Sequence, residues 1–275
     1  MSVLVPLAVD SEAALARLNP VAKVAAAGIV TLGMLLSLDP VTPAIVLAAE
    51  AVAFPFTGVR LGTLLRRSWP LLIGIAGVVV ANLVAVQGGE VLLELGPVDV
   101  TSAAVASAGT VALRLLALTL PGIIVLAVTD PMDLADALVQ RWRVPARFAY
   151  GALAALRLLP LLSADWHMIG RARRARGLDP GRSPVAHLRA FGGQVFAVLV
   201  AAVRRGVRLA AAMDARGFGA FGADPVTGTA AVPRTVARPQ PMRPADWLLV
   251  AATAVTVVGA IAVSVALGTW RLPFA

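Results

Sequence analysis

Residues 170–182 read GRARRARGLDPGR, and residues 212–222 read AMDARGFGAFG. Both stretches contain Ala-Arg-Gly, at positions 175–177 and 215–217. A basic residue in the last turn complements the negative end of the helix dipole, and a following glycine readily takes the left-handed conformation that ends a helix. One such tripeptide predicts only a helix end. Two copies, each preceded by further arginines, predict two long helices that end in the same way.

The composition is that of a membrane protein. Of the 275 residues, 59% are apolar and 14% are charged, whereas soluble domains are about 45–50% apolar and about 25% charged. The absence of cysteine excludes disulfides, thiolate nucleophiles and thiolate metal sites. With only His167 and His187 available, we expect no histidine-built metal site. We also expect no cleaved signal peptide, because Asp10 and Glu12 precede the first apolar run where basic residues would be needed.

Five stretches are long and apolar enough to cross a bilayer, which takes about 20 residues with a range of about 17–25. They are residues 21–38, 41–57, 70–87, 104–128 and 245–268. Trp69, Trp247 and Trp270 fall at the ends of these stretches, where interfacial tryptophan is favoured. Lys23 lies at the beginning of the first stretch, from which its amine can snorkel to the membrane surface. The expected fold class is an all-α integral membrane protein with about five transmembrane helices plus cytoplasmic coupling helices, two of them long.

The charges of the loops indicate the orientation of the chain. The 58–69 loop carries bases without acids, and the 88–103 loop carries acids without bases. These residues are Arg60, Arg66 and Arg67 in the first loop and Glu90, Glu94 and Asp99 in the second. Because basic loops stay in the cytoplasm, we expect the N-terminus and residues 129–244 to be cytoplasmic. The latter block holds 17 arginines against seven aspartates, which accounts for the net charge of the chain, +9.

The cytoplasmic block reads as three helices and a linker. Asp130-Pro131 opens a short helix, and a second helix is expected over 145–176 with a kink at Pro160. Ser183-Pro184 opens a third helix over 184–216, and a Gly/Pro-rich linker follows. The predicted domains are an N-terminal membrane domain of four spans (1–128), a coupling domain (129–217), a linker (218–244), and a C-terminal span and tail (245–275).

The two long helices leave one alternative open. Residues 148–164 and 190–203 are apolar enough to resemble spans. Arg157 interrupts the first, and the second has only 14 residues, a length typical of a buried or interfacial segment. We interpret both as amphipathic helices against the cytoplasmic side of the membrane, and the competing topology has seven spans.

The ends of these helices carry basic residues suited to acidic partners. His167, Arg171 and Arg174 share one face, because they are spaced i, i+4 and i+7. A guanidinium is a planar fork that pairs with carboxylates, and the small residues beside it allow close approach. Two acidic grooves on soluble partners would suit two such ends. The predicted docking residues are Ala175, Arg176, Gly177, Ala215, Arg216 and Gly217, supported by Arg171, Arg174, Arg205 and Arg208.

The order of these features resembles the transmembrane T component of energy-coupling factor (ECF) transporters, a family that includes the cobalt-type and biotin-type permease subunits. LARLNPVAKVAAAGIVTLGMLL resembles the opening of the family, with Asn19-Pro20 and Lys23 before the first span. DPMDLADALVQRWRVPARFAYGALAALRLLPLLSADWHMIGRARRARG resembles the segment in which an acidic short helix precedes the first Ala-Arg-Gly, and VRLAAAMDARGFG resembles the second. The resemblance covers nearly the whole chain.

The resemblance implies a mechanism and a set of partners. The chain would be a non-catalytic scaffold in the bacterial plasma membrane that docks two ABC-type ATPase subunits through Arg176 and Arg216. Closure of the ATPases on ATP would change the angle between the coupling helices and reorient a separate membrane S component that binds a vitamin or a metal ion. The apolar faces of 148–164 and 190–203 would contact that S component. The chain has no Gly-x-x-x-x-Gly-Lys-Ser/Thr loop, so we expect neither ATP hydrolysis nor a bound cofactor.

Three further expectations concern polar residues. Glu50 and Arg114 lie at similar predicted depths in the second and fourth spans, so we predict an intramembrane ion pair, with a proton or ion site as the functional alternative. Asn82 is expected to form a hydrogen bond between helices. The alternative function is a membrane enzyme of the phospholipid-transferase type, for which only Asp214 and Asp224 could hold the metal. A basic surface for anionic lipids could accompany docking, and no nucleic-acid partner is expected.

Overall fold

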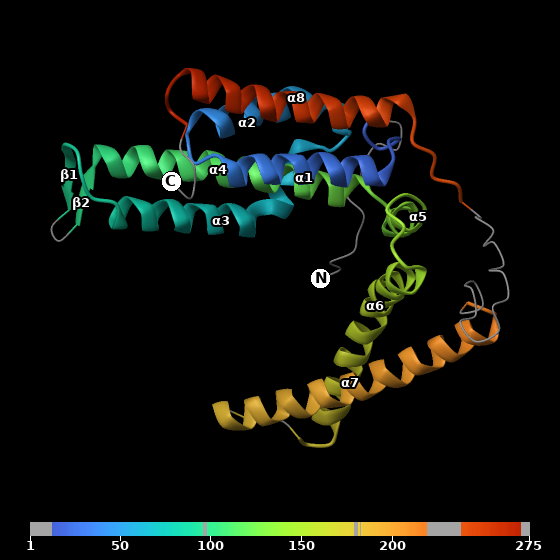
Figure 1. The fold of residues 1–275 in the computed structure, drawn as a ribbon. Coiled ribbons are helices and arrows are strands. Elements are labelled where there is room, and N and C mark those ends of the chain that lie inside the picture. The colour runs from blue at the N-terminus through green and yellow to red at the C-terminus, as the bar shows by residue number, and fades with distance from the viewer. Residues whose placement is uncertain (1–12, 96–97, 179–180, 182, 219–237, 271–275) are drawn as a thin grey trace, which may run out of the picture. The chain divides into compact units, whose positions relative to one another are not determined.

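The computed structural model describes residues 13–95, 98–178, 181, 183–218 and 238–270. Its elements are almost all helices, as predicted (Figure 1). The chain forms two compact units. Residues Val144–Pro239 form one, called here the inserted unit, and residues Val3–Arg143 with Gln240–Ala275 form the other, called here the membrane unit.

The helices of the membrane unit confirm the five apolar helices predicted from the sequence. They are α1 (Pro20–Leu36), α2 (Val41–Ala53) with the short 3-10 helix η1 (Phe54–Thr57), α3 (Leu61–Ala85), α4 (Ser102–Val128) and α8 (Pro244–Ala266). Helix α5 (Pro131–Arg141), which the sequence grouped with the coupling helices, also belongs to this unit and packs against α1. Contacts therefore divide the chain at Arg143 rather than at residue 129.

The predicted loop over residues 58–69 is wrong beyond Arg60, because α3 begins at Leu61. The prediction started the span at Pro70, a residue favoured in the first helical turn. Pro70 instead lies inside α3, and the leucines and arginines before it are good helix formers that continue the helix backwards. Arg60 and Arg66 are exposed at the start of this helix, whereas the side chains of Arg67, Glu94 and Asp99 lie outside the described set.

Length and composition identify four helices of the described chain as candidates to cross a membrane. They are residues Ser68–Ala85 within α3, all of α4, α6 (Ala146–Ala175) and α8. Helices α1 and α2, the latter continued by η1, are apolar but shorter. Helix α6 contains one of the two stretches that the sequence left open between an amphipathic surface helix and a further span.

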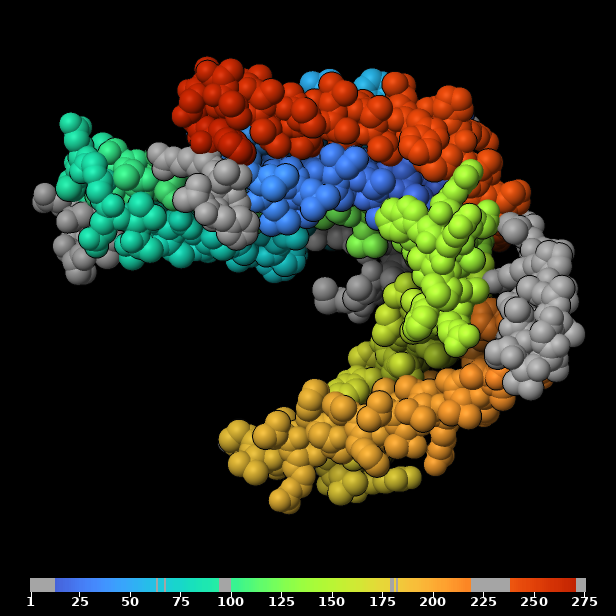
Figure 2. Space-filling view, viewed as in Figure 1, coloured from blue at the N-terminus to red at the C-terminus, as the bar shows by residue number. Residues whose placement is uncertain are grey.

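The core of the membrane unit forms where α8 packs along α1 and α2, although it follows them by two hundred positions in the sequence (Figure 2). A side chain at Gly33 would overlap Cγ1 of Val257, so glycine permits the close approach of α1 and α8. The buried cluster draws on α1, α2, α4 and α8. Its members are Val30, Met34, Val46, Ala117, Val257 and Ala260.

Helices α3 and α4 form a second close pair. Ser107 Oγ of α4 donates a hydrogen bond to Asn82 Oδ1 of α3 at 3.3 Å, which confirms the predicted bond between helices. The predicted loop between the two helices is wrong in part, because residues Val91–Leu95 (β1) and Val98–Thr101 (β2) form an antiparallel hairpin. The prediction counted only the charges of this segment, whereas VDVT alternates β-branched residues with an acidic one and Val91 begins the other strand with a β-branched residue, a type enriched in strands.

Asp39 fixes the turn between α1 and α2. Its carboxylate is 2% exposed and accepts hydrogen bonds from the backbone N–H of Thr42 at 2.7 Å, the Thr42 hydroxyl at 3.0 Å, and the hydroxyls of Ser37 and Ser264. Burial alone would raise the pKa of this carboxyl, but the hydrogen bonds outweigh burial and hold its pKa below the ordinary value. Since Ser264 belongs to α8, the same carboxylate also ties the turn to the last helix.

Replacing Asp39 with asparagine should destabilise the protein by about 1–3 kcal/mol, because an amide N–H₂ would face donors at one of the oxygens. A carboxyl whose pKa is lowered on folding stabilises the fold above its unfolded pKa, and this contribution is lost as the pH falls through the folded pKa. Thermal unfolding in detergent between neutral and acidic pH measures the effect. Wild type should lose more stability on acidification than Asp39→Asn, whereas Glu90→Gln, at an exposed carboxylate, should behave as wild type. Equal pH profiles for wild type and Asp39→Asn would contradict this role.

Candidate docking site at two helix ends

The inserted unit contains the two long helices that the Ala-Arg-Gly pattern predicts. They are α6 (Ala146–Ala175), with Pro160 inside it, and α7 (Pro184–Ala215). Ser183 begins α7 as predicted, since its hydroxyl accepts a hydrogen bond from the backbone N–H of Ala186 at 3.4 Å. The predicted helix limits are therefore confirmed to within one or two residues.

Both helices end with the same hydrogen-bonded turn. In α6, the N–H of Gly177 donates to the carbonyl of Arg174 at 3.0 Å, and the N–H of Leu178 donates to the carbonyl of Arg173 at 3.1 Å. In α7, the equivalent bonds run from Gly217 to Asp214 at 2.9 Å and from Phe218 to Met213 at 3.0 Å. This is the Schellman pattern, which needs a residue with positive φ after the cap. Gly177 and Gly217 supply it with φ of 73° and 77°.

The cap itself is not what distinguishes these two ends. Helix α8 ends in the same way, since Gly268 has φ of 67° and the N–H of Thr269 donates to the carbonyl of Ser264 at 3.1 Å. Leu267 occupies the cap position there, whereas Arg176 and Arg216 occupy it in α6 and α7. Arginine at the cap is therefore a feature of the inserted unit rather than a requirement of the turn.

The guanidinium groups of Arg176 and Arg216 are available to a partner. Both residues are exposed, and neither side chain has a hydrogen-bond or ion-pair partner within the described part of the chain. Ala175 and Ala215 beside them are also exposed. Each helix end thus presents an unpaired cation between two small residues.

The predicted supporting arginines divide into two groups. Arg171 and Arg174 are exposed on α6, as predicted. Arg205 instead forms an ion pair with Asp165 of α6, with both guanidinium terminal nitrogens on the carboxylate and one of these bonds at 3.1 Å. Arg208 Nε donates to the carbonyl of Arg204 on its own helix at 3.3 Å. Arg205 therefore binds within the inserted unit, whereas Arg171 and Arg174 are exposed near the end of α6.

Two further polar side chains bridge α6 and α7, and the sequence did not identify them. Arg173 Nη1 donates to the carbonyl of Ala190 at 2.6 Å, and Gln194 Nε2 donates to the carbonyl of Trp166 at 2.7 Å. A Cβ on Gly193 would lie 2.6 Å from Arg173 Nη2, so that glycine makes room for the guanidinium. The paired glycines of AFGGQVF, in the middle of a predicted helix, were the signal available in the sequence.

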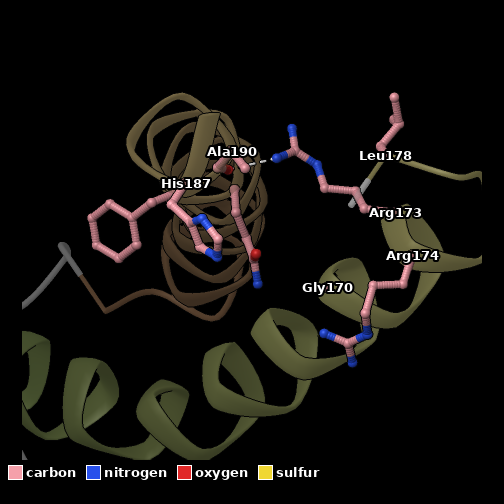
Figure 3. A pocket seen from close by; sticks show the side chains of 8 residues that line it. Gly170, Arg173, Arg174, Leu178, His187 and Ala190 are labelled. Carbon is pink, nitrogen blue, oxygen red and sulfur yellow. Dashed lines mark hydrogen bonds between the residues drawn. The ribbon is translucent and has the colours of Figure 1, made fainter. Parts of the chain in front are cut away.

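A cavity of about 260 Å³ lies beside these bridges (Figure 3). Figure 3 shows the side chain of Arg173 reaching the α7 backbone at Ala190, while Arg174 points away from that contact. The Nδ1 of His187 lies 3.1 Å from the carbonyl of Ser183. The full lining is Gly170, Arg173, Arg174, Leu178, His187, Ala190, Phe191 and Gln194.

Contacts near both ends show that α6 and α7 run in opposite directions, and the two helices cross each other (Figure 1). Arg173, near the end of α6, meets Ala190, near the start of α7. Tyr150, near the start of α6, packs edge-on against Phe218, after the end of α7, with ring centroids 6.1 Å apart. Arg176 and Arg216 therefore lie near opposite ends of the pair. For a helix of 30 residues, that separation is on the order of 40 Å at 1.5 Å per residue.

The predicted ion pair between Glu50 and Arg114 is wrong. Both carboxyl oxygens of Glu50 are buried without a hydrogen-bond partner in the described chain. Helices α2 and α4 run in the same direction, and Val46 shares a core cluster with Ala117 (Figure 1). Glu50 lies four residues beyond Val46, whereas Arg114 lies three residues before Ala117, so the two are about 10 Å apart along the axes. The prediction assumed that both helices begin at one level.

A Glu50→Gln variant should be as stable as wild type or more stable, because a buried amide costs less than an unpaired buried charge. Thermal unfolding in detergent measures this, with Arg114→Gln and the double variant beside it. Additive effects are expected. If each single variant loses stability and the double variant loses no more than either single variant, the Glu50–Arg114 ion pair would be supported after all.

The Asp165–Arg205 pair should determine the angle between α6 and α7. Because the chain has no cysteine, nitroxide labels on Leu178→Cys and Val207→Cys, both at exposed positions, report that angle as a distance. Asp165→Arg should broaden or shift the distance distribution, and Asp165→Arg with Arg205→Asp should restore it. Arg204→Asp, an exposed neighbour, is the control. An unchanged distribution in Asp165→Arg would refute the assignment.

No group of three histidine, cysteine, aspartate or glutamate side chains that could hold a metal occurs among the described residues. Asp214, one of the two carboxylates behind the enzyme alternative, is exposed in the last turn of α7. Asp224, the other, lies outside the described residues.

Comparison with known proteins supports the resemblance. Residues 11–225 match the family described as CbiQ, cobalt transport protein. Energy-coupling factor transporter transmembrane protein EcfT 1 of Listeria monocytogenes is 28% identical over 185 residues, which cover 64% of this chain and 70% of that protein. The transmembrane protein EcfT of Thermosediminibacter oceani is 30% identical over 182 residues, 63% of this chain and 67% of that protein.

The EcfT protein of Heliobacterium modesticaldum is 29% identical over 210 residues, which cover 73% of this chain and 78% of that protein. The family match extends over most of the chain and includes both Ala-Arg-Gly ends. The chain therefore belongs to the CbiQ family of cobalt transport proteins and is a non-catalytic transmembrane component of a transporter.

Proposed function

We propose that the chain is the T component of an ECF-type importer and docks two ABC-type ATPase subunits, one at each Ala-Arg-Gly end. One observation carries this proposal. Two helices end in the same turn, and each places an exposed arginine without a partner in the described chain at the cap position. Arg171 and Arg174 are also exposed, but only Arg176 and Arg216 occupy the cap position of the shared turn, whereas Arg205 pairs with Asp165 within the unit.

The chemistry of each end suits an acidic groove. A guanidinium forms two parallel hydrogen bonds with a carboxylate, and such charge-assisted bonds are about twice as strong as neutral ones. Ala175 and Gly177 on one helix, and Ala215 and Gly217 on the other, leave the backbone open to close approach. With the two arginines on the order of 40 Å apart along the helix pair, two separate docking points are supported rather than one shared groove.

Exposed apolar side chains on the same helices support a membrane partner. On α6 they include Leu156, Leu159 and Leu161, and on α7 they include Phe196, Leu199 and Val203. Large exposed apolar patches mark protein or membrane contacts. We assign these faces to a separate S component that binds the transported vitamin or metal ion.

The orientation proposed for the chain places its N-terminus and the inserted unit in the cytoplasm of a bacterial cell. The arginines that support it, Arg60 and Arg66, are exposed at the start of α3, and cytoplasmic segments carry an excess of Lys and Arg. Docking to soluble ATPases requires the same orientation, so charge and proposed function agree.

Reversing the charge at either docking end should release the ATPases. Arg176→Glu and Arg216→Glu should each lower ATPase co-purification and uptake by about tenfold or more, because attraction to a carboxylate becomes repulsion. The double variant should abolish both. Arg204→Glu, at an exposed arginine in the middle of α7, is the matched control. Full transport by the double variant would refute docking through these residues.

A further inference from the structure

The chain returns from the inserted unit to α8 through residues 238–244, RPQPMRP, and Gln240 lies in that segment. Its N–H donates to Gln140 Oε1 at 2.9 Å, and its side-chain amide donates to Asp133 Oδ1 at 3.4 Å. Its carbonyl accepts from Asn19 Nδ2 at 3.1 Å and from Arg141 Nε at 3.4 Å. These five residues, called here the Gln240 junction, join three distant parts of the sequence.

The sequence around Gln240 is suited to this arrangement. Pro239 and Pro241 flank it, and a proline fixes its own φ and restricts the residue before it to extended conformations. The segment is therefore held extended at a reduced entropy cost, and Gln240 contributes a backbone donor where its neighbours have none.

The junction is attached to the starts of α1 and α8. Asn19, which is 5% exposed, begins α1, with its Oδ1 accepting from the N–H of Val21 at 2.9 Å. The N–H of Asn19 donates to Asp246 Oδ1 at 2.7 Å, and Asp246 Oδ2 accepts from the N–H of Arg243 at 2.6 Å, at the start of α8. Asn19 thus holds the starts of both helices and the Gln240 carbonyl together.

Lys23 extends this network to the end of α4. Its Nζ donates to the carbonyls of Ala16 and Val128 at 3.1 and 3.2 Å, and the residue is 2% exposed. The predicted snorkelling of Lys23 to the membrane surface is therefore wrong. The amine is held by backbone carbonyls, one of which belongs to the last residue of α4, where a cation is favoured.

The Gln240 junction lies where the chain passes between the two units. The chain passes between the units at Arg143–Val144 and again at Pro239–Gln240. Gln140 and Arg141 lie just before the first crossing, and Gln240 lies directly after the second. Arg143 has φ of 52°, an uncommon conformation for a residue other than glycine. Both crossings are thus fixed to each other within the membrane unit.

We infer that the Gln240 junction passes the motion of the inserted unit to the membrane helices, which makes Asn19, Gln140 and Gln240 positioning residues for energy coupling. The inference rests on the proposed function. If the crossings were free of each other, a displacement of the inserted unit would be absorbed by the two connecting segments. With both crossings hydrogen-bonded together and to Asn19, a displacement at either one reaches the starts of α1 and α8.

The test compares two substitutions of Gln140 in the full complex. Gln140→Leu removes the acceptor for the Gln240 N–H, and Gln140→Glu keeps an acceptor oxygen at the same place. We expect Gln140→Leu to keep ATPase co-purification and ATP hydrolysis but to lower the uptake per ATP hydrolysed by about tenfold, since the part-buried Gln240 N–H loses its acceptor and the two crossings lose a bond between them. Gln140→Glu should stay close to wild type. Equal ratios of uptake to hydrolysis in Gln140→Leu and wild type would overturn the inference.

A cross-link between positions 140 and 240 tests the same inference if Gln140→Leu fails to reach the membrane. Because the chain has no cysteine, Gln140→Cys with Gln240→Cys offers a single reactive pair for a short bifunctional thiol reagent. Before cross-linking, this variant lacks the Gln140 acceptor, so its uptake per ATP hydrolysed should be low, as in Gln140→Leu. The cross-link should raise that ratio towards the wild-type value, because it closes the same contact. A ratio that stays low after cross-linking, or that is already at the wild-type value before it, would overturn the inference. A wild-type chain that neither binds ATPases nor supports ATP-dependent uptake would instead overturn the proposed function.

Discussion

The hydrogen bond from the N–H of Asn19 to Asp246 joins two residues that are 227 positions apart, and the membrane unit depends on it. Helix α8 supplies Val257 and Ala260 to the core, but it is made only after residues 144–239 have been inserted between it and α5. A helix that reaches its partner after so long an interruption needs a fixed register. Asp246 provides it, because the same carboxylate begins α8 and binds the start of α1.

Much of the fold could be predicted because its signals are local. Asp130-Pro131, Ser183-Pro184 and the two glycines after arginine act within a few residues, so they gave the limits of α5, α6 and α7 closely. The predictions were wrong where a side chain's environment depends on a helix that is distant in the sequence. The Glu50–Arg114 pairing depended on the relative level of two helices, and the burial of Lys23 depended on the end of α4. Residue spacing in the sequence predicts neither the relative level of two packed helices nor the burial of a side chain against a distant helix.

The candidate site was predictable for a different reason than the fold. The Schellman turn at the end of α8 shows that glycine at this position is ordinary helix termination, so the glycines alone carry no functional information. The feature that distinguishes α6 and α7 from α8 is the arginine at the cap position of each helix. The structure also separates the surrounding arginines by use, since Arg173 and Arg205 bind α7 and α6 respectively while Arg176 and Arg216 bind nothing within the described chain. Composition could not make that distinction, because all of these residues look equivalent in a basic sequence.

The bridges between α6 and α7 constrain how a docked partner could move the chain. Arg173 and Gln194 bond to backbone carbonyls of the opposite helix, and backbone carbonyls cannot turn away as side chains can. The Asp165–Arg205 pair joins two side chains that are 18% and 31% exposed, so water can replace its partners more easily. A change in the angle between the helices is therefore easiest about the Arg173–Gln194 contacts, with Asp165 and Arg205 separating. A displacement that leaves all three bridges closed must move α6 and α7 as one body, and that movement can reach the membrane helices through the chain only at the two crossings that Gln240 holds together.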